Sequence, residues 1–409
     1  MRSLYTLALR LALPWILLRL WWRGRREPGY RDRVAERFGH YSISSRPKLL
    51  WIHAVSVGEA RAAAPLVRAL QTALPDHATL LTCTTAAGRE TLKQVYGETV
   101  LAAYLPYDYP GAVQRFLEHF RPRLGVLMET EVWPNLIAGC AGNRVPVVLA
   151  NARLSDKSAR GYERWSGLTT PAFASLGAVC AQSAEDAVRL HSVGARNVAV
   201  TGNLKFDVTP DPAQLAAGRE WRRSIGRPVL LLASTREGEE QPLLSAIARM
   251  GSKDLLVVVV PRHPQRFDEV AQCADARRSH KELPAENHKI YLGDTMGEMA
   301  FYFAACDVAV IGGSFQPLGG QNLIEALAAG APVVTGPSMF NFAEATRLAV
   351  DAGAAIQTSD VASAVQTAQG ILMDAQRRQR MAEAGRKLCE THRGATQRHL
   401  QICRKLLGL

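Results

Sequence analysis

Several patterns that would assign a function by themselves are missing from this sequence of 409 residues. None of its seven cysteines stands in a C-x-x-C pair, which argues against a disulfide framework or a zinc site. The thiols are therefore expected to be buried apolar groups in a reducing compartment. No Asp-x-Asp pair occurs, so a diphosphate bound through a metal is not indicated. Internal repeats and low-complexity stretches are also absent from the sequence.

Aromatic residues make up only 7% of the chain, and no basic segment alternates with aromatic residues. That composition makes nucleic acid the weaker candidate for a partner. Positive charge is plentiful, because 49 Lys and Arg outnumber 37 Asp and Glu to give a net charge of +12. The balance favours an anionic partner such as an acidic lipid or a phosphorylated substrate.

The N-terminal segment, residues 4–22, is apolar except for Thr6, Arg10 and Arg19, and further arginines follow it. Adjacent tryptophans at positions 21 and 22 beside arginines suit a membrane interface, and no cleavage site of small residues follows. The internal arginines make a full span marginal, since a span needs about 20 apolar residues. We predict a membrane anchor in residues 1–26, either monotopic or a short span, with the body in the cytoplasm. The alternative is an amphipathic helix packed on the body.

Apolar runs alternate with helical segments along the rest of the chain. Strands are predicted at residues 48–53, 79–84, 101–105, 124–128, 145–150, 178–181, 198–201, 228–233, 255–260, 290–292, 308–311 and 332–335. This α/β alternation predicts two parallel sheets covered on both faces. The proline-rich residues 208–212 predict a linker between domains at 27–209 and 210–409 that face a cleft, with the last helix free to return to the first domain.

Polar side chains follow three strands of the first half, where binding groups of a parallel sheet belong. Ser56 and Glu59 form either a helix cap or a general base at a helix start, and their spacing alone favours the cap. Glu129 and Glu131 are candidates for holding a metal or sugar hydroxyls, or simply for an acidic helix start. Lys205 is either a phosphate-stabilising cation or a solvated residue near the hinge.

The second half carries a glycine-rich stretch, VIGGSFQPLGGQNLIE, at residues 310–325. A strand, a turn with bare backbone amides and a helix over residues 322–330 would bind phosphate. Asn322 and Glu325 would share one helical face, with Glu325 on a sugar hydroxyl. A tight turn with a surface Glu is the alternative. Arg262 follows the apolar strand predicted at residues 255–260. Its guanidinium would either bind phosphate through two hydrogen bonds or form an ion pair within the loop.

Eleven motifs taken together resemble one family, the 3-deoxy-D-manno-octulosonic acid (Kdo) transferases. Besides the N-terminal segment with YRDRVAERFG they are HAVSVGEA, YLPYD, METEVWPN, NARLS, GNLKFD, STREGEE, VPRHPQRF, GDTMGE, IGGSFQPLGGQNLIEA and GPSMFNF. They follow the family's order and span nearly the whole chain. The resemblance implies an inverting GT-B glycosyltransferase with two Rossmann-like domains, which transfers Kdo from CMP-Kdo to a lipid A precursor (lipid IVA) in lipopolysaccharide core biosynthesis. It places the enzyme on the cytoplasmic face of the inner membrane and implies no metal or other cofactor.

The resemblance also assigns roles to individual residues. Glu59 becomes the general base, and Glu129 and Lys205 become transition-state stabilisers. CMP contacts fall on Pro261, Arg262, Met296, Gly297, Glu298, Asn322, Leu323, Ile324 and Glu325. Many family members have His where this chain has Gln321, which cannot hold a charge. The rival interpretations are a UDP-sugar transferase or epimerase of the same fold and a non-enzymatic protein that binds membrane or nucleic acid.

Overall fold

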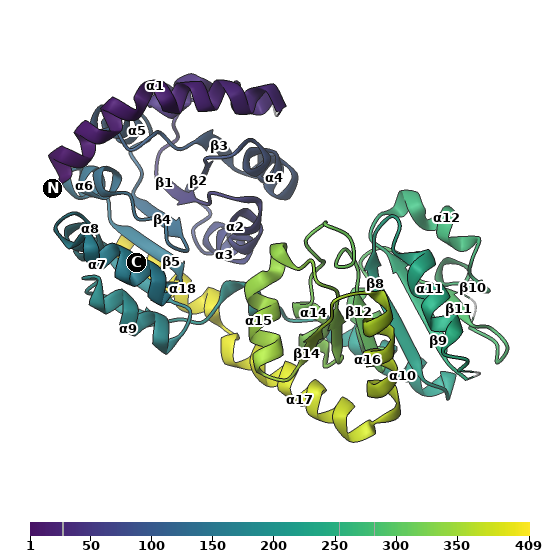
Figure 1. Ribbon diagram of the computed structural model, residues 1–409. Helices are drawn as coiled ribbons and strands as arrows, with labels where there is room; N and C mark the ends of the chain where they lie inside the picture. The colour runs from purple at the N-terminus through teal and green to yellow at the C-terminus, as the bar shows by residue number, and fades with distance from the viewer. Residues whose placement is uncertain (27, 253, 282) are drawn as a thin grey trace. The chain divides into compact units, whose positions relative to one another are not determined.

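The computed structural model describes residues 1–26, 28–252, 254–281 and 283–409 (Figure 1). The chain forms two compact units, Met1–Asp207 with Gly394–Leu409, and Val208–Arg393. The first crossing therefore lies at Asp207–Val208, two residues before the predicted boundary. The second crossing, at Arg393–Gly394, returns the last helix to the first unit.

The first unit is built on one parallel sheet in the order β3-β2-β1-β4-β5-β6-β7. Its strands are β1 (Leu49–His53), β2 (Ala78–Cys83), β3 (Leu101–Tyr104), β4 (Leu124–Met128), β5 (Val147–Ala152), β6 (Ala178–Ala181) and β7 (Val198–Val200). Both faces are buried: Leu49 and Trp51 belong to one apolar cluster, and Leu50 and Ile52 to another. The alternation follows from the two-residue period of a strand. These apolar runs confirm the predicted two-faced sheet.

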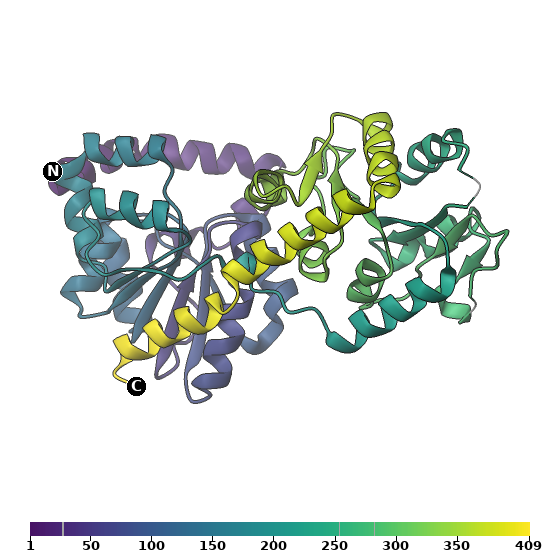
Figure 2. The ribbon, with the colours of Figure 1, turned by 90° about the horizontal axis from the view of Figure 1, so that it is seen from below.

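Helices cover both faces of this sheet. They are α2 (Val57–Ala62), α3 (Ala64–Ala73), α4 (Ala86–Tyr96), α5 (Pro110–Phe120), α6 (Pro134–Gly142), α7 (Asp156–Arg164), α8 (Ser166–Ala174), α9 (Ala184–Ser192) and α18 (Ala395–Leu407). The terminal helix α18 lies on the sheet beside α3, with Leu400 and Cys403 in the same core cluster as Leu50 (Figure 2). It is separated from α17 (Ala375–His392) by Gly394, whose φ of 77° suits glycine.

The second unit repeats the architecture with the order β10-β11-β9-β8-β12-β13-β14. Its strands are β8 (Val229–Thr235), β9 (Leu256–Pro261), β10 (Ala276–Arg277), β11 (Ile290–Leu292), β12 (Val308–Ile311), β13 (Val333–Thr335) and β14 (Ala355–Gln357), all parallel. The helices are α10 (Pro212–Ile225), α11 (Glu240–Arg249), α12 (Phe267–Ala271), α13 (Met299–Ala304), α14 (Ile324–Ala329), α15 (Ala343–Asp351), α16 (Val361–Met373) and α17. The short strands β10 and β14 were not predicted.

Strand order reverses at one point in each sheet, between β1 and β4 and between β8 and β12. Ligands of open α/β sheets bind outside the carboxyl ends of the strands at such points. Glu59 lies in α2, which follows β1, and Glu129 lies in the loop after β4. Asn322 lies in the loop after β12, and Glu325 lies in α14, which follows that loop. The strand orders thus explain why these predicted site residues lie at the carboxyl ends of the central strands, in one group for each sheet.

The cysteines follow the prediction in part. Cys83, Cys140, Cys180, Cys389 and Cys403 are buried, whereas Cys306 is half-buried and Cys273 is exposed. Burial raises the pKa of the Cys83 thiol to about 12, so this group stays protonated.

Candidate active site

Glu59 stands in the first turn of α2, directly after β1. Its carboxylate accepts hydrogen bonds from the Val55 N–H (2.9 Å) and the Ser56 hydroxyl (2.9 Å). The Ser56 Oγ in turn accepts from the Glu59 N–H, so the helix cap favoured by the spacing is present. Burial raises the pKa of Glu59 to about 7, and nearby Glu129 adds to the effect, although the Val55 N–H opposes it. A carboxyl held in one orientation with a pKa near neutrality suits a general base, so the cap and the base are compatible roles.

Glu129 and Lys205 form an ion pair in the same unit. Lys205 Nζ lies 3.0 Å from Glu129 Oε1, and Arg153 Nη2 lies 4.0 Å from Oε2. Glu129 has a φ of 57° at the end of β4, a left-handed conformation that costs about 1–3 kcal/mol in a residue other than glycine. Glu129 directly follows β4, and its charge contributes to the raised pKa of Glu59. Lys205 is therefore paired and not the solvated hinge residue of the alternative prediction.

The acidic residues after β4 do not cap the next helix. The backbone amides of Asn135 and Leu136 donate to the carboxylate of Asp108, at 3.0 and 2.7 Å. Glu131 instead accepts from the indole of Trp133 (2.7 Å), and burial raises its pKa. The explanation of Glu129 and Glu131 as an acidic helix start is wrong, because a residue 27 positions upstream of Asn135 supplies the cap.

A buried amide network holds the 3₁₀ turn that carries Lys205, and sequence reasoning missed it. Asn151 accepts from the Leu204 N–H through Oδ1 (2.9 Å), and Asn203 accepts from the Lys205 N–H (2.9 Å). The Asn203 amide donates to Gln182, whose own amide donates to the Asn151 carbonyl. His399 of α18 closes the network, because its Nε2 accepts from the Asn151 N–H (3.0 Å). The motifs NARLS and GNLKFD are the sequence signal for this network.

In the second unit, Arg262 follows β9 and donates through Nε to the Gln321 side-chain oxygen (3.2 Å). Asn322 donates through Nδ2 to Glu325 (2.9 Å) and accepts from the Ile324 N–H (3.0 Å). Burial raises the pKa of Glu325, while the Asn322 amide and the charge of Arg262 oppose the rise. These four residues lie together. The helix starts at Ile324, two residues later than predicted, because Asn322 turns the chain with its own side chain.

The glycine-rich turn offers fewer bare amides than expected, because many of them donate to groups within the unit. Buried Glu239 accepts from the amides of Gly313 (2.6 Å) and Phe315 (3.0 Å), and from that of Arg236 (2.9 Å). Further amides of the turn, at Gly312, Leu318, Gly319, Gly320 and Gln321, donate to Ala233, Gln316, Ser338, Gly313 and Gly312. The carboxylate of Glu239 therefore stabilises the glycine-rich turn, and it binds amides that we predicted to bind a phosphate.

The other predicted CMP contacts divide into three groups. Leu323 and Ile324 are buried side chains, so only their backbone could face a ligand. Met296, Gly297 and Glu298 follow β11, three strand spacings or roughly 14 Å from β12. Glu298 pairs with Arg278 at 3.0 Å, and Met296 is exposed. Pro261 is the last residue of β9, next to Arg262.

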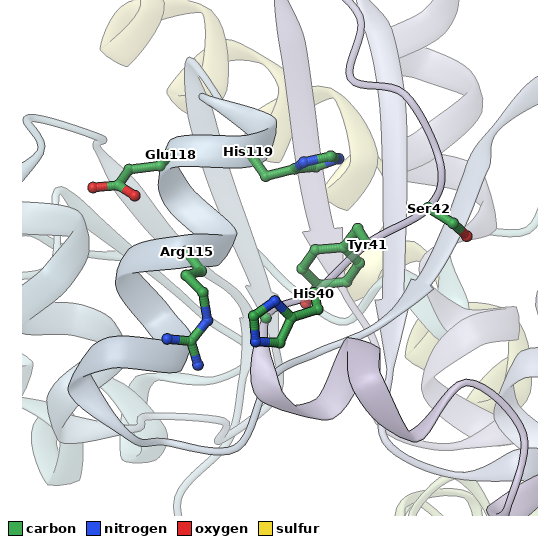
Figure 3. Close-up of a pocket in the computed structure, with 7 residues that line it drawn as sticks. His40, Tyr41, Ser42, Arg115, Glu118 and His119 are labelled. Carbon is green, nitrogen blue, oxygen red and sulfur yellow. The ribbon is translucent and has the colours of Figure 1, made fainter.

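A hollow of about 570 Å³ lies elsewhere on the first unit. Figure 3 shows Arg115, Glu118 and His119 of α5 with His40, Tyr41 and Ser42 of the neighbouring loop. Among the described residues that line it, none belongs to the predicted site.

Comparison with known proteins identifies the family of this chain. A family model described as 3-deoxy-D-manno-octulosonic-acid transferase (kdotransferase) matches residues 32–208, and one described as glycosyl transferases group 1 matches residues 273–388. A 3-deoxy-D-manno-octulosonic acid transferase of Bordetella pertussis is 46% identical over 100% of both chains. This chain belongs to the Kdo transferase family. One of Haemophilus influenzae is 36% identical over 99% of each.

As a member of the Kdo transferase family, the protein is a glycosyltransferase. The alternative interpretation of a non-enzymatic binding protein is therefore wrong. Its fold is GT-B: the Acinetobacter baumannii MurG structure, 15% identical, gives a TM-score of 0.57 over 88% of this chain and 100% of that one.

Proposed function

We propose that this transferase moves Kdo from CMP-Kdo to a lipid A precursor, lipid IVA, with inversion at the anomeric carbon, in lipopolysaccharide core biosynthesis. Family membership supports the Kdo transfer. The environment of Glu59 is the observation that supports the mechanism. Inversion needs one base and no covalent intermediate, and a carboxyl with a pKa of about 7 can take the proton of a sugar hydroxyl near neutral pH.

In the proposed reaction, the acceptor hydroxyl loses its proton to Glu59 as its oxygen attacks the anomeric carbon of Kdo. The bond from that carbon to the phosphate oxygen of CMP breaks, and CMP leaves with the bonding electrons. Arg262 would bind the phosphate of CMP, and Lys205 would stabilise the negative charge that develops in the transition state. Glu129 keeps Lys205 in place by the 3.0 Å ion pair. We propose that no metal takes part, since the leaving group is a monophosphate ester that these cations can neutralise.

For the donor, we propose that Arg262 and the Asn322–Glu325 segment contact CMP, with Glu325 accepting hydrogen bonds from the ribose hydroxyls. Glu325 is suited to this because its carboxylate is already oriented by the Asn322 amide. Gln321 stands where many family members have His, and its side-chain oxygen accepts a hydrogen bond from Arg262. Met296, Gly297 and Glu298 would meet a more distant part of the donor.

We further propose that the enzyme works on the cytoplasmic face of the inner membrane and needs no nucleic acid partner. The helix α1 (Arg2–Arg26) is the described helix that is long and apolar enough to cross a membrane, over Arg2–Arg25. Its arginines suit an anionic membrane surface.

The proposal is tested by incubating the enzyme in detergent with CMP-Kdo and tetraacylated lipid A precursor, and resolving the products by mass spectrometry. Mass increments of one or more Kdo units are expected, with none from UDP-sugars. NMR of the product should show the anomeric configuration opposite to that of the donor. Intact acceptor with folded enzyme would overturn the donor and acceptor, and a retained configuration would overturn the mechanism.

A further inference from the structure

The N-terminal helix α1 is tied to the first unit along its length. The Tyr109 hydroxyl donates to the Leu9 carbonyl (2.7 Å), and the Asn135 amide donates to the Thr6 hydroxyl (3.0 Å). Near its other end, Arg31 donates to the Trp21 carbonyl (3.0 Å). Figure 1 shows α1 running across the first unit beside α5 and α6. Leaving the unit would break all of these contacts.

One side of α1 nevertheless stays apolar and exposed. Its members are Leu4 (66% exposed), Leu7 (52%), Leu11 (75%), Trp15 (61%), Leu18 (62%) and Trp22 (57%). Their spacing of three or four residues places them in one stripe along the helix. The intervening positions Leu9, Ala12, Ile16 and Leu20 are half-buried or buried against the unit. We call the six exposed residues the apolar stripe.

The charges around the apolar stripe are of one sign. Residues 2–26 contain six arginines and no acidic residue. Exposed Arg10 and Arg19 lie about 100° and 80° from Leu11 around the helix, one on each flank, at about 100° per residue. The guanidinium of Arg19 lies 5.5 Å from the Trp15 ring, and that of Arg25 lies 4.2 Å from the Trp21 ring. An apolar stripe flanked by arginines and tryptophans suits the interface between lipid chains and headgroups.

A second apolar feature lies beside the start of α1. Trp165, in the turn between α7 and α8, is 59% exposed. The Met1 side chain packs over Gly167, where an added Cβ would lie 2.9 Å from Met1 Cγ. The start of α1 therefore lies against the beginning of α8, which directly follows Trp165.

We propose that α1 does not cross the bilayer but lies flat in one leaflet of an anionic membrane, with the apolar stripe among the lipid chains and the opposite side still packed on the first unit. This inference rests on the membrane association of the proposed function and adds its geometry. The occupant is lipid and not a second copy of the chain, because six arginines without one acid would repel a matching helix. The same charge attracts acidic headgroups.

The geometry has a consequence for the acceptor. α1 contacts Tyr109, in the loop after β3, and Asn135, in the first turn of α6 after β4, both at the carboxyl edge of the sheet. Glu59 and Glu129 follow β1 and β4 at that same edge. A helix lying in the leaflet brings this edge to the headgroup level, where a sugar headgroup of a lipid would meet the base without leaving the membrane.

Depth measurements with spin labels test the proposal. Four variants of the full-length protein carry Cys273→Ser and one added cysteine each, at Leu4, Leu11, Ala12 or Trp22. Each added cysteine is labelled with a nitroxide, and the protein is bound to vesicles that contain phosphatidylglycerol. Leu4, Leu11 and Trp22 should show one shallow depth, with more access for oxygen than for a nickel chelate. Ala12 should be shielded from both probes. Leu4 and Trp22 at opposite surfaces, with Leu11 at the bilayer centre, would overturn the proposal.

Two further outcomes would also overturn the proposed geometry. One is that the labels are exposed to water. The other is that the label at Leu11 is shielded from both probes in a protein of doubled mass, which would show that a second copy of the chain covers the apolar stripe.

A binding experiment supplies the matched control. Leu11→Glu with Trp15→Glu should weaken vesicle binding at least about tenfold. Val188→Glu on α9, an apolar residue 69% exposed away from the stripe, should leave binding unchanged. Transfer to detergent-solubilised acceptor is assayed on the same samples, so failure of the proposed function is separated from failure of this geometry.

Discussion

Lys205 Nζ lies 3.0 Å from the carboxylate of Glu129, although the two residues are 76 positions apart. The pair joins the end of β4 to the 3₁₀ turn Leu204–Phe206, and its negative member also raises the pKa of Glu59. The structure therefore couples the proposed base electrostatically to the proposed phosphate-stabilising cation through one carboxylate.

Replacing Glu129 by Gln tests this coupling. Removing a negative charge near Glu59 should lower the pKa of that base, so the acidic limb of the rate profile should move to lower pH. The maximal rate should fall about 10²–10³-fold, as for loss of a preorganised electrostatic group. Stability should change by less than about 1 kcal/mol, since the pair is partly exposed. An unmoved acidic limb would show that Glu129 and Glu59 are not coupled.

Glu59→Gln should stabilise the protein at alkaline pH while abolishing transfer. The folded pKa of Glu59, about 7, exceeds its ordinary value of 4.5. The folded state therefore binds more protons between these values, and wild-type stability decreases as pH rises from 4.5 to 7. The neutral amide escapes this loss, which is about 3 kcal/mol. Thermal unfolding at pH 8 should give the variant the higher Tm, and an equal or lower Tm would contradict the raised pKa.

Glu239→Gln should impair the second unit. The carboxylate uses both oxygens to hold three amides around the glycine-rich turn, and an amide retains only one acceptor. Each buried N–H left unpaired costs about 1–3 kcal/mol. CMP binding by calorimetry should weaken at least about tenfold with a lower Tm. Glu237→Gln is the matched control, because Glu237 is exposed in the same loop. Normal CMP binding in Glu239→Gln would show that the turn does not position the donor.

His399→Leu should loosen the turn that carries Lys205. Burial lowers the pKa of His399 to about 4, and its neutral Nε2 accepts from the Asn151 N–H. The unfolded residue titrates near 6.5, so wild-type stability is complete above that pH and is lost as pH falls toward 4. The variant lacks this contribution, about 2 kcal/mol between pH 6.5 and 5.

His399→Leu should have a lower Tm than the wild type at pH 7, but its Tm should decrease less than that of the wild type as the pH is lowered. Its maximal rate should fall without a matching change in KM, because the network positions Lys205 and does not bind substrate. Gln397→Leu, an exposed change on the same helix, should match the wild type in both measurements. Equal acid sensitivity in His399→Leu and the wild type would contradict the role of His399.

Much of the fold could be predicted because buried parallel strands are short apolar runs: β4, β6, β11 and β12 coincide with their predicted ranges. The edge strands β10 and β14 have only two and three residues and carry no such signal. The identities of Glu59, Glu129 and Lys205 came from motifs. The residues that hold the surrounding turns did not, because Asp108, Glu239 and His399 act on residues 27, 74 and 248 positions away, a distance that local patterns do not report.

The rate of Kdo transfer as a function of pH, in wild type and in Glu59→Gln, tests the proposed mechanism most directly. The wild type, in single turnovers with CMP-Kdo and the lipid A precursor, should accelerate with pH through an apparent pKa of about 7 and then level off. Glu59→Gln should bind CMP normally and form no product at any pH. A variant that transfers Kdo at a comparable rate, or a wild-type profile flat between pH 6 and 8, would contradict Glu59 as the base.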